Sequence, residues 1–310
     1  MKIIFAGTPK FALPSLKTLL NSHHEIIAII TQPDRPRGRH LKLMASPIKK
    51  MAISYKIPVF QPLTLNNEEF KEKIVELKPD IVIVVAFGQL IPQWLLNLPK
   101  YGCVNAHASL LPKYRGAAPI QRVIMDGSSE TGVTTMFMDN ELDTGDILLQ
   151  TKVSISDDET AGELHDKLAE LSSNLLLKTI DGLDAGTIKP IRQNDTEASF
   201  APKIKDNETK INWGNSAEKI RNIIRALNPT PGAHTLFKGK RLKIFKVETV
   251  SPKNHFPPGT ISEVEKNIGF MVNASDKALL ILEVQPEGKR IMAANEFCKG
   301  HNLKKGDRVE

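Results

Sequence analysis

The chain has 310 residues, which is enough for two hydrophobic cores or for one large one. Its composition, 41% hydrophobic and 25% charged, is that of an ordinary globular protein, and no stretch approaches the length of an apolar membrane span. Cys103 and Cys298 are its only cysteines, which excludes a disulfide framework. The apolar run after Met1 is too short for a signal peptide. We therefore expect a cytoplasmic protein with no membrane partner.

The net charge of +7 is concentrated in the last third of the chain. Residues 1–200 carry 22 Lys and Arg against 23 Asp and Glu, a balance of −1. Residues 201–310 carry 20 against 12, a balance of +8. This asymmetry is typical of a neutral domain joined to a domain that holds a polyanion, and a basic domain that is merely well solvated has the same composition.

Strand and helix patterns alternate through the first part of the chain. The predicted strands cover 2–6, 25–30 and 80–87, and the predicted helices cover 11–20 and 66–77. The alternation predicts an α/β fold with a doubly wound, mostly parallel, Rossmann-like sheet, whose ligands bind beyond the carboxyl ends of the strands. The turn after the first strand contains only Gly7, where a dinucleotide-binding fingerprint needs three glycines, so we exclude NAD.

Residues 34–51 form a basic segment in which no acidic residue follows Asp34. Pro36, Gly38 and Pro47 argue against one continuous helix. A solvated loop and a loop that contacts phosphates both fit this composition. The basic residues of the segment are Arg35, Arg37, Arg39, Lys42, Lys49 and Lys50.

The next elements complete a first domain over 1–189. A strand over 131–139 leads to the motif L-D-T-G-D at 142–146, and a strand over 146–155 precedes a helix over 161–180. Residues 190–205 lack periodicity and mix proline with polar residues, so we place a linker there.

The remainder, 206–310, has the pattern of a small β domain. A helix over 216–227 is followed by short apolar runs with turn residues between them, and this spacing suggests a small β-barrel. The predicted strands cover 234–237, 241–250, 260–264, 268–272, 278–284 and 290–292.

The stretch 105–120, N-A-H-A-S-L-L-P-K-Y-R-G-A-A-P-I, follows a buried strand and contains the most informative pair. Asn105 and His107 are two residues apart, so on an extended segment their side chains point to the same face. An amide can hydrogen-bond an oxyanion, an imidazole can move or stabilise a proton, and a carboxylate can orient the imidazole. Such a set suits acyl-type transfer without a covalent nucleophile.

Two carboxylates, Asp143 and Asp146, could complete this set, and spacing does not decide which one faces the site. Ser109 is not surrounded by a G-x-S-x-G elbow, which argues against a serine hydrolase. Cys103 lies between Gly102 and Val104, where a small core residue is expected. The eight histidines are scattered without paired ligand spacing, so we predict no metal site.

The motif N-x-H-x-S-L-L-P-x-x-x-G, followed by L-D-T-G-D, resembles that of the folate-dependent formyltransferases. The additional motifs F-A-G-T-P at 5–9, T-Q-P-D at 31–34 and R-G-A-A-P-I-Q at 115–121 are similar to those of the members that act on methionyl-tRNA. The resemblance runs from Met1 to about the last predicted strand and is most specific in the first half.

The resemblance implies a formyl group passed from 10-formyltetrahydrofolate to the α-amine of initiator methionyl-tRNA by direct attack. The residues that it makes catalytic are Asn105, His107 and Asp143, and those that it places against the folate are Ser109, Leu110, Leu111 and Pro112. It also implies that an OB-like barrel and the basic loop bind tRNA, the loop through Arg35, Arg37, Arg39 and Lys42, with Arg39 as the key arginine. We expect a monomer that uses no metal.

Three alternatives remain open at this point. A glycinamide ribonucleotide transformylase shares the first motif but needs no basic C-terminal domain. A sugar-nucleotide formyltransferase would favour a nucleotide-phosphate pocket over an extended basic face. A nucleic-acid-binding module with a decayed enzyme core is disfavoured because Asn105, His107 and Asp143 are all present.

Overall fold

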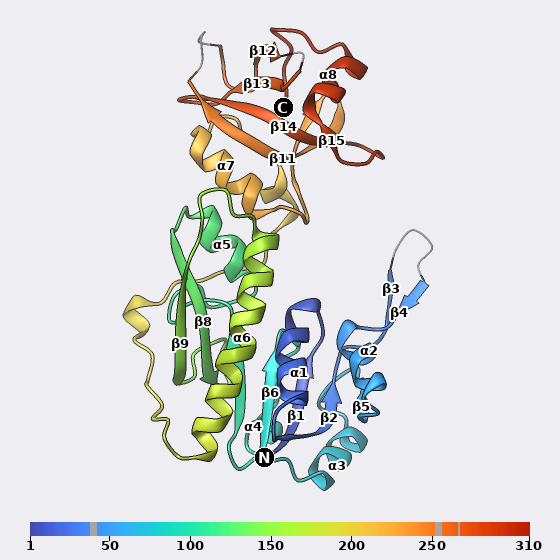
Figure 1. Ribbon diagram of the computed structural model, residues 1–310, viewed down its shortest axis with the longest axis vertical. Helices are drawn as coiled ribbons and strands as arrows, with labels where there is room; N and C mark the ends of the chain where they lie inside the picture. Colours follow the sequence, from blue (N-terminus) through green and yellow to red (C-terminus); the bar gives the residue numbers. More distant parts are fainter. Residues whose placement is uncertain (38–41, 252–255, 266) are drawn as a thin grey trace. The chain divides into compact units, whose positions relative to one another are not determined.

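Figure 1 shows the computed structural model of the protein, which describes residues 1–37, 42–251, 256–265 and 267–310. Its packing divides the chain into two units. The first comprises Met1–Ala117, Glu130–Ser154 and His165–Ala201, and the second comprises Ala118–Ser129, Ile155–Leu164 and Pro202–Glu310. Among the described residues, none of the helices combines the length and apolar character that crossing a membrane requires.

The first unit is built on a seven-stranded sheet (Figure 1). Its strands are β1 (Lys2–Gly7), β2 (Glu25–Ile30), β5 (Val59–Phe60), β6 (Ile81–Val85), β7 (Cys103–His107), β8 (Glu130–Phe137) and β9 (Ile147–Ser154). The strand order is β5-β2-β1-β6-β7-β8-β9. The strands from β5 to β7 pair in parallel, whereas β8 and β9 extend the sheet as antiparallel strands. The predicted α/β fold with a mostly parallel sheet is confirmed.

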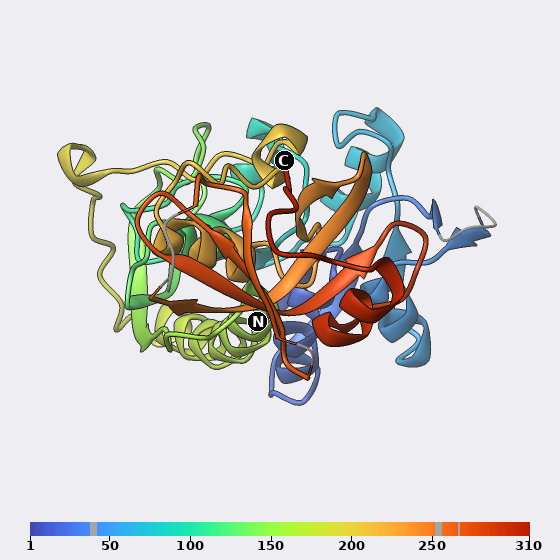
Figure 2. The same cartoon turned by 90° about the horizontal axis from the view of Figure 1, so that it is seen from above.

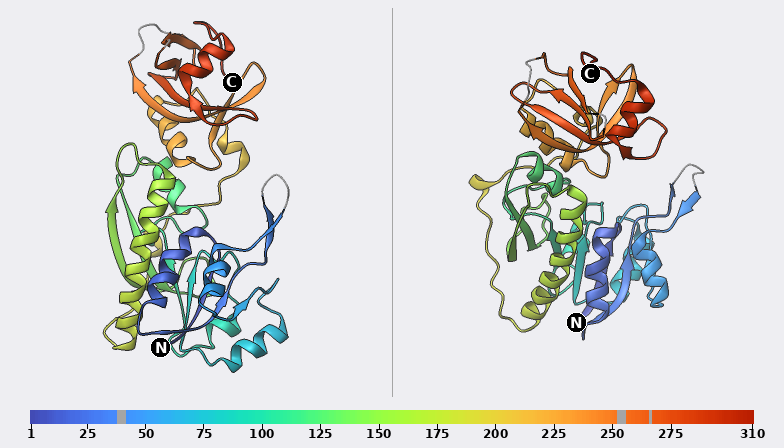
Figure 3. Two further views of the ribbon diagram at one scale, coloured as in Figure 1. Left: turned by 45° about the vertical axis from the view of Figure 1, so that its right-hand side comes forward. Right: turned by 45° about the horizontal axis from the view of Figure 1, so that its top comes forward.

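Helices cover both faces of this sheet, as expected of a doubly wound fold. They are α1 (Leu13–Leu20), α2 (Pro47–Ser54), α3 (Glu68–Glu76), α4 (Gln93–Leu96) and α6 (Ala161–Asp184). One face of the central strands packs on α3 and α4, where Ile4 and Val82 share a buried cluster with Phe70 and Leu95. Figure 3 shows α1 and α6 side by side on the opposite face, and the ring of Phe11 meets that of His165 there at 5.2 Å.

The basic segment 34–51 is not a loop throughout. The strands β3 (Arg35–Arg37) and β4 (Lys42–Met44) form an antiparallel ribbon that projects from the first unit (Figure 1). Helix α2 then begins at Pro47, where the Ser46 hydroxyl accepts a hydrogen bond from the Lys49 N–H, and it buries Ile48. A serine N-cap followed by proline at the first helical position is a start signal that outweighs the local basic composition.

The segment predicted as a linker, 190–205, is attached to the first unit as far as Ala201. The Ile191 N–H donates to the Ile147 carbonyl, and Gln193 is buried. Its polar side chains form specific hydrogen bonds instead of the apolar stripe that periodicity detects, which explains why the sequence pattern gave no signal of this packing.

The second unit contains an antiparallel β domain. Its strands are β10 (Ala233–Phe237), β11 (Lys240–Val250), β12 (Ile261–Glu265), β13 (Gly269–Asn273), β14 (Ala278–Pro286) and β15 (Met292–Ala293). The order is β10-β11-β14-β13-β12, with β15 paired to β14, and Figure 2 shows these strands and α8 (Ala294–His301) from above. The residues near the C-terminus bridge the two edge strands, because Val309 pairs with Phe237 and Arg308 pairs with Thr260. These bridges close the sheet into a barrel.

Two further helices belong to the second unit, α5 (Pro119–Met125) and α7 (Ala217–Ala226). They pack against each other, and α7 also covers β11. The barrel interior is apolar, with Ile220 of α7 in the same buried cluster as Trp213, Phe270 and Phe297. The sequence pattern predicted α7 and all six strands from β10 to β15. It missed α5 and α8, whose short apolar faces are interrupted by polar residues.

Candidate active site

Strand β7 carries the two side chains that the sequence singled out. Asn105 and His107 are both on β7, where the alternation of side chains places them on one face. Pairing on both sides fixes their positions, since Asn105 lies between Val84 of β6 and Met136 of β8. His107 is 7% exposed, and Asn105 is partly exposed. The pair therefore lies on a rigid element at the carboxyl end of a central strand.

A carboxylate lies beside the imidazole. Nδ1 of His107 is 3.6 Å from Oδ2 of Asp143, and its Nε2 is 2.9 Å from the carbonyl oxygen of Tyr114. A carbonyl only accepts hydrogen bonds, so Nε2 carries a hydrogen in this arrangement. Oδ2 of Asp143 accepts a hydrogen bond of 2.8 Å from the Gly116 N–H. The spacing left Asp143 and Asp146 as alternatives, and the structure places Asp143 beside His107.

The backbone after β7 is shaped to present that N–H. Gly116 has a φ of +126°, a conformation that L side chains rarely adopt, and a Cβ there would lie 2.7 Å from the Ala201 carbonyl oxygen. The flanking chain is fixed by residues of the predicted linker, because the Tyr114 N–H donates to the Ser199 hydroxyl at 2.9 Å. Glycine at 116 is therefore needed for the contact with Asp143.

Gln193 holds the other side of the Asp143 turn. Its amide nitrogen donates to the carbonyl oxygens of Asp143 and Gly145 at 2.9 Å and 2.7 Å. Its amide oxygen accepts from Nε and Nη2 of Arg115 at 3.1 Å and 2.8 Å, and Nη2 also contacts Asp195 at 2.8 Å. Gln193 and Arg115 are 6% and 4% exposed. Sequence reasoning missed this network, because nothing near residue 193 indicates partners 50 positions away.

The turn that follows His107 is fixed by one buried hydroxyl. Thr134 of β8 donates to the Ser109 carbonyl at 2.7 Å and accepts from the Leu111 N–H at 3.1 Å. Gln150 of β9 donates to the Leu111 carbonyl at 2.8 Å and to the Thr134 hydroxyl at 2.9 Å. Ser109 itself is buried and donates to the Lys113 carbonyl at 2.6 Å. Its hydroxyl is therefore used within the turn.

A pocket of about 270 Å³ lies where β1, β2 and β6 end. It is lined by Thr8, Gln32, Pro33, Arg35, Met44, Ser46 and Gly88. The Thr8 hydroxyl donates to the Phe87 carbonyl at 3.2 Å, and Gln32 donates to the same carbonyl at 3.3 Å. These bonds tie the strand ends together at the same edge of the sheet at which β7 ends with His107.

Three of the four basic residues predicted to bind tRNA, Arg35, Arg37 and Lys42, belong to the strands of the β3–β4 ribbon. Arg35 is exposed, and its Nη2 donates to Gln32 at 3.3 Å. Arg37 and Lys42 pair across the ribbon through their backbones, and their side chains lie outside the described part of the structure. Arg39 lies outside the described residues altogether.

The second unit carries a further basic surface. Its β10–β11 hairpin has exposed Lys238, Lys240, Arg241 and Lys246, while Leu242 and Ile244 of β11 point into the barrel core. The alternation of side chains along β11 is interrupted where its register on β14 shifts, between Ile244 and Val247, and Lys246 is exposed there. The periodicity of the sequence predicted the strand, but it did not indicate this irregularity.

Comparisons with known proteins decide the family. Residues 1–180 match the family described as formyl transferase, and residues 203–302 match the formyl transferase C-terminal domain. The chain belongs to the formyl transferase family. It is 46% identical over 307 residues to a methionyl-tRNA formyltransferase of Caldanaerobacter subterraneus subsp. tengcongensis, with 99% of each chain covered. A methionyl-tRNA formyltransferase of Clostridium tetani is 47% identical, with 99% of this chain and 98% of the relative covered.

A solved structure shows the same formyl transferase fold. The N-formyltransferase from Helicobacter canadensis, in complex with folinic acid and dTDP-3-aminofucose, superposes with a TM-score of 0.68 at 24% identity. The alignment covers 91% of this chain and 99% of that one. The family matches and the relatives of 46% and 47% identity confirm the formyltransferase family inferred from the motifs around His107.

Proposed function

We propose that the protein is an enzyme that transfers the formyl group of 10-formyltetrahydrofolate to the α-amino group of initiator methionyl-tRNA, acting as a monomer in the cytoplasm. The observation that carries this proposal is the placement of Asn105, His107 and Asp143 together, in a chain related over nearly its whole length to methionyl-tRNA formyltransferases.

The proposed reaction is a direct transfer. The free amine attacks the formyl carbon, a tetrahedral oxyanion forms, and the bond from that carbon to N10 of the folate then breaks. The amine loses a proton and N10 gains one. Two donors on one face of β7, the Asn105 amide and the His107 imidazole, suit stabilisation of the oxyanion, since charge develops there only in the transition state.

His107 has to change partner to take part. Nε2 donates to the Tyr114 carbonyl in this structure, so it must exchange that bond for one to the substrate oxygen. Asp143 does not have to move with it, because the Gly116 N–H fixes its carboxylate. We assign to Asp143 the orientation of the imidazole and, through water, acceptance of the proton that the amine loses.

The turn 109–112 suits a flat donor. Leu110 is partly exposed and lies against Gly132 of β8, so it offers apolar surface, while Thr134 and Gln150 keep the backbone of the turn in place. Apolar side chains on a rigid turn with available backbone groups are the usual means of holding a ring system. We infer that Ser109, Leu110, Leu111 and Pro112 hold the folate.

The charge distribution supports a polyanionic acceptor. The balance of +8 in residues 201–310 includes the exposed basic side chains of the β10–β11 hairpin, and Arg35 lines the pocket at the sheet edge. We infer that the hairpin contacts the tRNA backbone and that Arg35, with Arg37, Arg39 and Lys42 of the same segment, contacts the acceptor end. Binding releases the cations condensed on the tRNA phosphates, and added salt opposes that release, so affinity for tRNA should fall steeply as salt is added.

The test is incubation with 10-formyltetrahydrofolate and one of three acceptors: methionyl-tRNA, glycinamide ribonucleotide or a dTDP-amino sugar. Formylation of methionyl-tRNA alone is expected, and formylation of another acceptor in its place would refute the proposal. His107→Ala and Asn105→Ala should each lower kcat by about 10²–10³-fold, the effect of losing one oxyanion donor. The control is His165→Ala, a histidine on α6 outside this site. Near-normal turnover by either site variant would remove that residue from the mechanism.

A further inference from the structure

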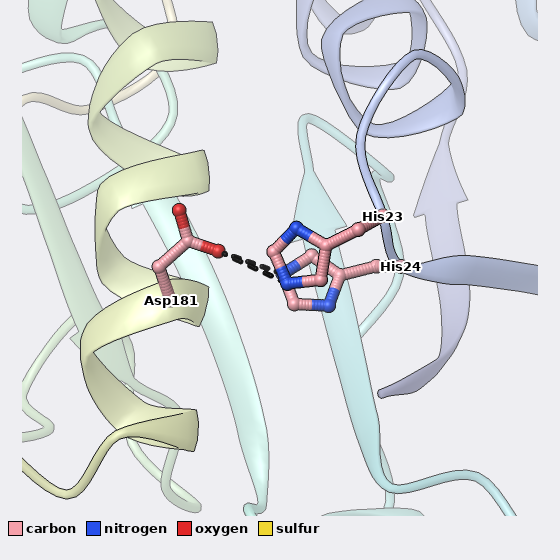
Figure 4. Close-up of side chains that lie close together, drawn as sticks. All are labelled: His23, His24 and Asp181. Carbon is pink, nitrogen blue, oxygen red and sulfur yellow. Dashed lines mark hydrogen bonds and ion pairs between the residues drawn. The ribbon is translucent and has the colours of Figure 1, made fainter.

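Two histidines and one aspartate converge at a second place in the first unit (Figure 4). His23 and His24 lie in the turn between α1 and β2, and Asp181 lies on α6. Nε2 of His24 is 2.9 Å from Oδ1 of Asp181, and Nε2 of His23 is 3.8 Å from the same oxygen. One ligand atom from each side chain lies within 4.8 Å of the other two. The sequence pattern predicted no metal site, because Asp181 is distant from the histidines in the chain.

These separations suit a bound metal ion. At metal–ligand distances of about 2.0–2.2 Å, tetrahedral ligand atoms lie roughly 3.3–3.6 Å apart. The two measured separations, 2.9 Å and 3.8 Å, fall on either side of that value, so small side-chain rotations are sufficient. The two rings are also stacked at a tilt, 4.0 Å between centroids, and both direct Nε2 toward the carboxylate (Figure 4).

His24 is already held in the orientation that a ligand needs. Its side chain is buried, and its Nδ1 is 3.3 Å from the Met1 amino group, which leaves Nε2 on the side of Asp181.

The ligand set selects the class of metal. Two imidazoles and one carboxylate suit the later divalent transition metals such as Zn²⁺, whereas Mg²⁺ and Ca²⁺ prefer oxygen ligands alone. His23 is 70% exposed and Asp181 is 46% exposed, so water can complete the coordination. The site lies just before β2 begins, at the amino ends of the parallel strands, whereas His107 lies at the carboxyl end of β7.

We propose that His23, His24 and Asp181 form a binding site for a divalent transition metal that links the α1–β2 turn to α6. As the metal binds, Nε2 of His24 gives up its hydrogen to solvent and the Met1 amino group passes a proton to Nδ1, so the ring stays neutral and one proton is released in all. Three coordinate bonds then replace the hydrogen bond to Asp181. The ion thereby stabilises the first unit, and the chemistry at His107 does not depend on it.

The experiment uses the full chain without an affinity tag, stripped with a chelator and then titrated with Zn²⁺ against a chromophoric competitor. A single zinc ion per chain is expected, together with a rise in Tm. His23→Ala, which changes an exposed side chain, should weaken binding by at least about 10-fold and abolish the rise in Tm, as should Asp181→Asn. His165→Ala is the matched control, because His165 is also paired with an aspartate, at 2.9 Å, but has no second histidine beside it among the residues that the structure describes.

Formyl transfer by the stripped protein should equal that of the zinc-loaded protein. The proposed site would be refuted if His23→Ala bound zinc as tightly as the wild type does. It would also be refuted if the His165→Ala control lost as much zinc affinity as His23→Ala. A fall in kcat on stripping would overturn its assignment as a stabilising site separate from catalysis.

Discussion

Gln193→Leu is expected to lower both stability and turnover, although Gln193 itself is about 6% exposed and lies outside every motif. Leucine has nearly the same volume, so the change removes hydrogen bonds without opening a large cavity. It leaves the carbonyls of Asp143 and Gly145 without a donor and deprives the Arg115 guanidinium of an acceptor. Arg115 keeps its bond to Asp195, so its loss is partial.

The magnitude follows from counting those groups. A buried polar group left unsatisfied costs roughly 1–3 kcal/mol. Leaving two carbonyls and one partly compensated guanidinium unsatisfied should lower the free energy of unfolding of the first unit by about 3–5 kcal/mol. This loss raises its unfolding equilibrium constant by at least about a hundredfold. The released turn carries Asp143, and a displacement of about 1 Å at a catalytic group can cost 10²-fold in rate. We therefore expect kcat to fall by up to that factor, with little change in the KM for methionyl-tRNA.

The assay can isolate the first unit because the chain has two tryptophans, Trp94 in the first unit and Trp213 in the second. In a Trp213→Phe background, the fluorescence of Trp94 during urea denaturation reports the first unit. Arg192→Leu is the control, since Arg192 is the exposed neighbour of Gln193. An unchanged urea midpoint, or a stability loss with normal kcat, would refute the reasoning that Gln193 positions Asp143.

Three further outcomes are expected. Thr134→Val should raise the KM for the folate several-fold and leave tRNA affinity unchanged, because it removes the hydroxyl that fixes the turn after β7. The hydrogen bond from Arg122 lowers the pKa of Glu208, so Glu208→Gln should destabilise the second unit at pH 7. The difference in stability between this variant and the wild type should shrink as the pH falls from 4.5, the ordinary pKa, through the lower pKa of the folded state. Burial raises the pKa of Cys103 to about 12 and of Cys298 to about 11, so neither thiol should react with iodoacetamide at pH 8 until urea unfolds the chain.

The parts of the fold that the sequence predicted are those with local patterns. Strand β6 is five consecutive buried aliphatic residues, and α7 has apolar side chains on one face, so both follow from periodicity. Asn105 and His107 could be paired from a spacing of two. The proximity of His107 to Asp143 could be inferred only from the family, because a turn 27 residues beyond Gly116 has no local signal of its contact.

The parts that could not be predicted depend on contacts distant in the chain. Thr134 has the sequence context of an ordinary strand residue, and its function depends on pairing opposite His107 across β7 and β8. The closure of the barrel depends on Val309 and Arg308, whose terminal segment is too short and polar to indicate a strand. Helix α2 is different, since Ser46 and Pro47 did provide a start signal that the surrounding basic residues obscured.

The distances around His107 show how the surrounding backbone positions the carboxylate of Asp143 beside the imidazole. Asp143 lies 3.6 Å from Nδ1, longer than a hydrogen bond, while the Gly116 N–H holds its carboxylate at 2.8 Å. The carboxylate is therefore positioned by backbone, and the Gln193 network positions the backbone of the same turn from the other side. Within the described residues, the hydrogen bond that the imidazole would give up in the proposed mechanism is the one to the Tyr114 carbonyl. In the proposed mechanism, His107 turns to the developing oxyanion while the carboxylate beside it stays fixed, so the rearrangement is confined to the imidazole.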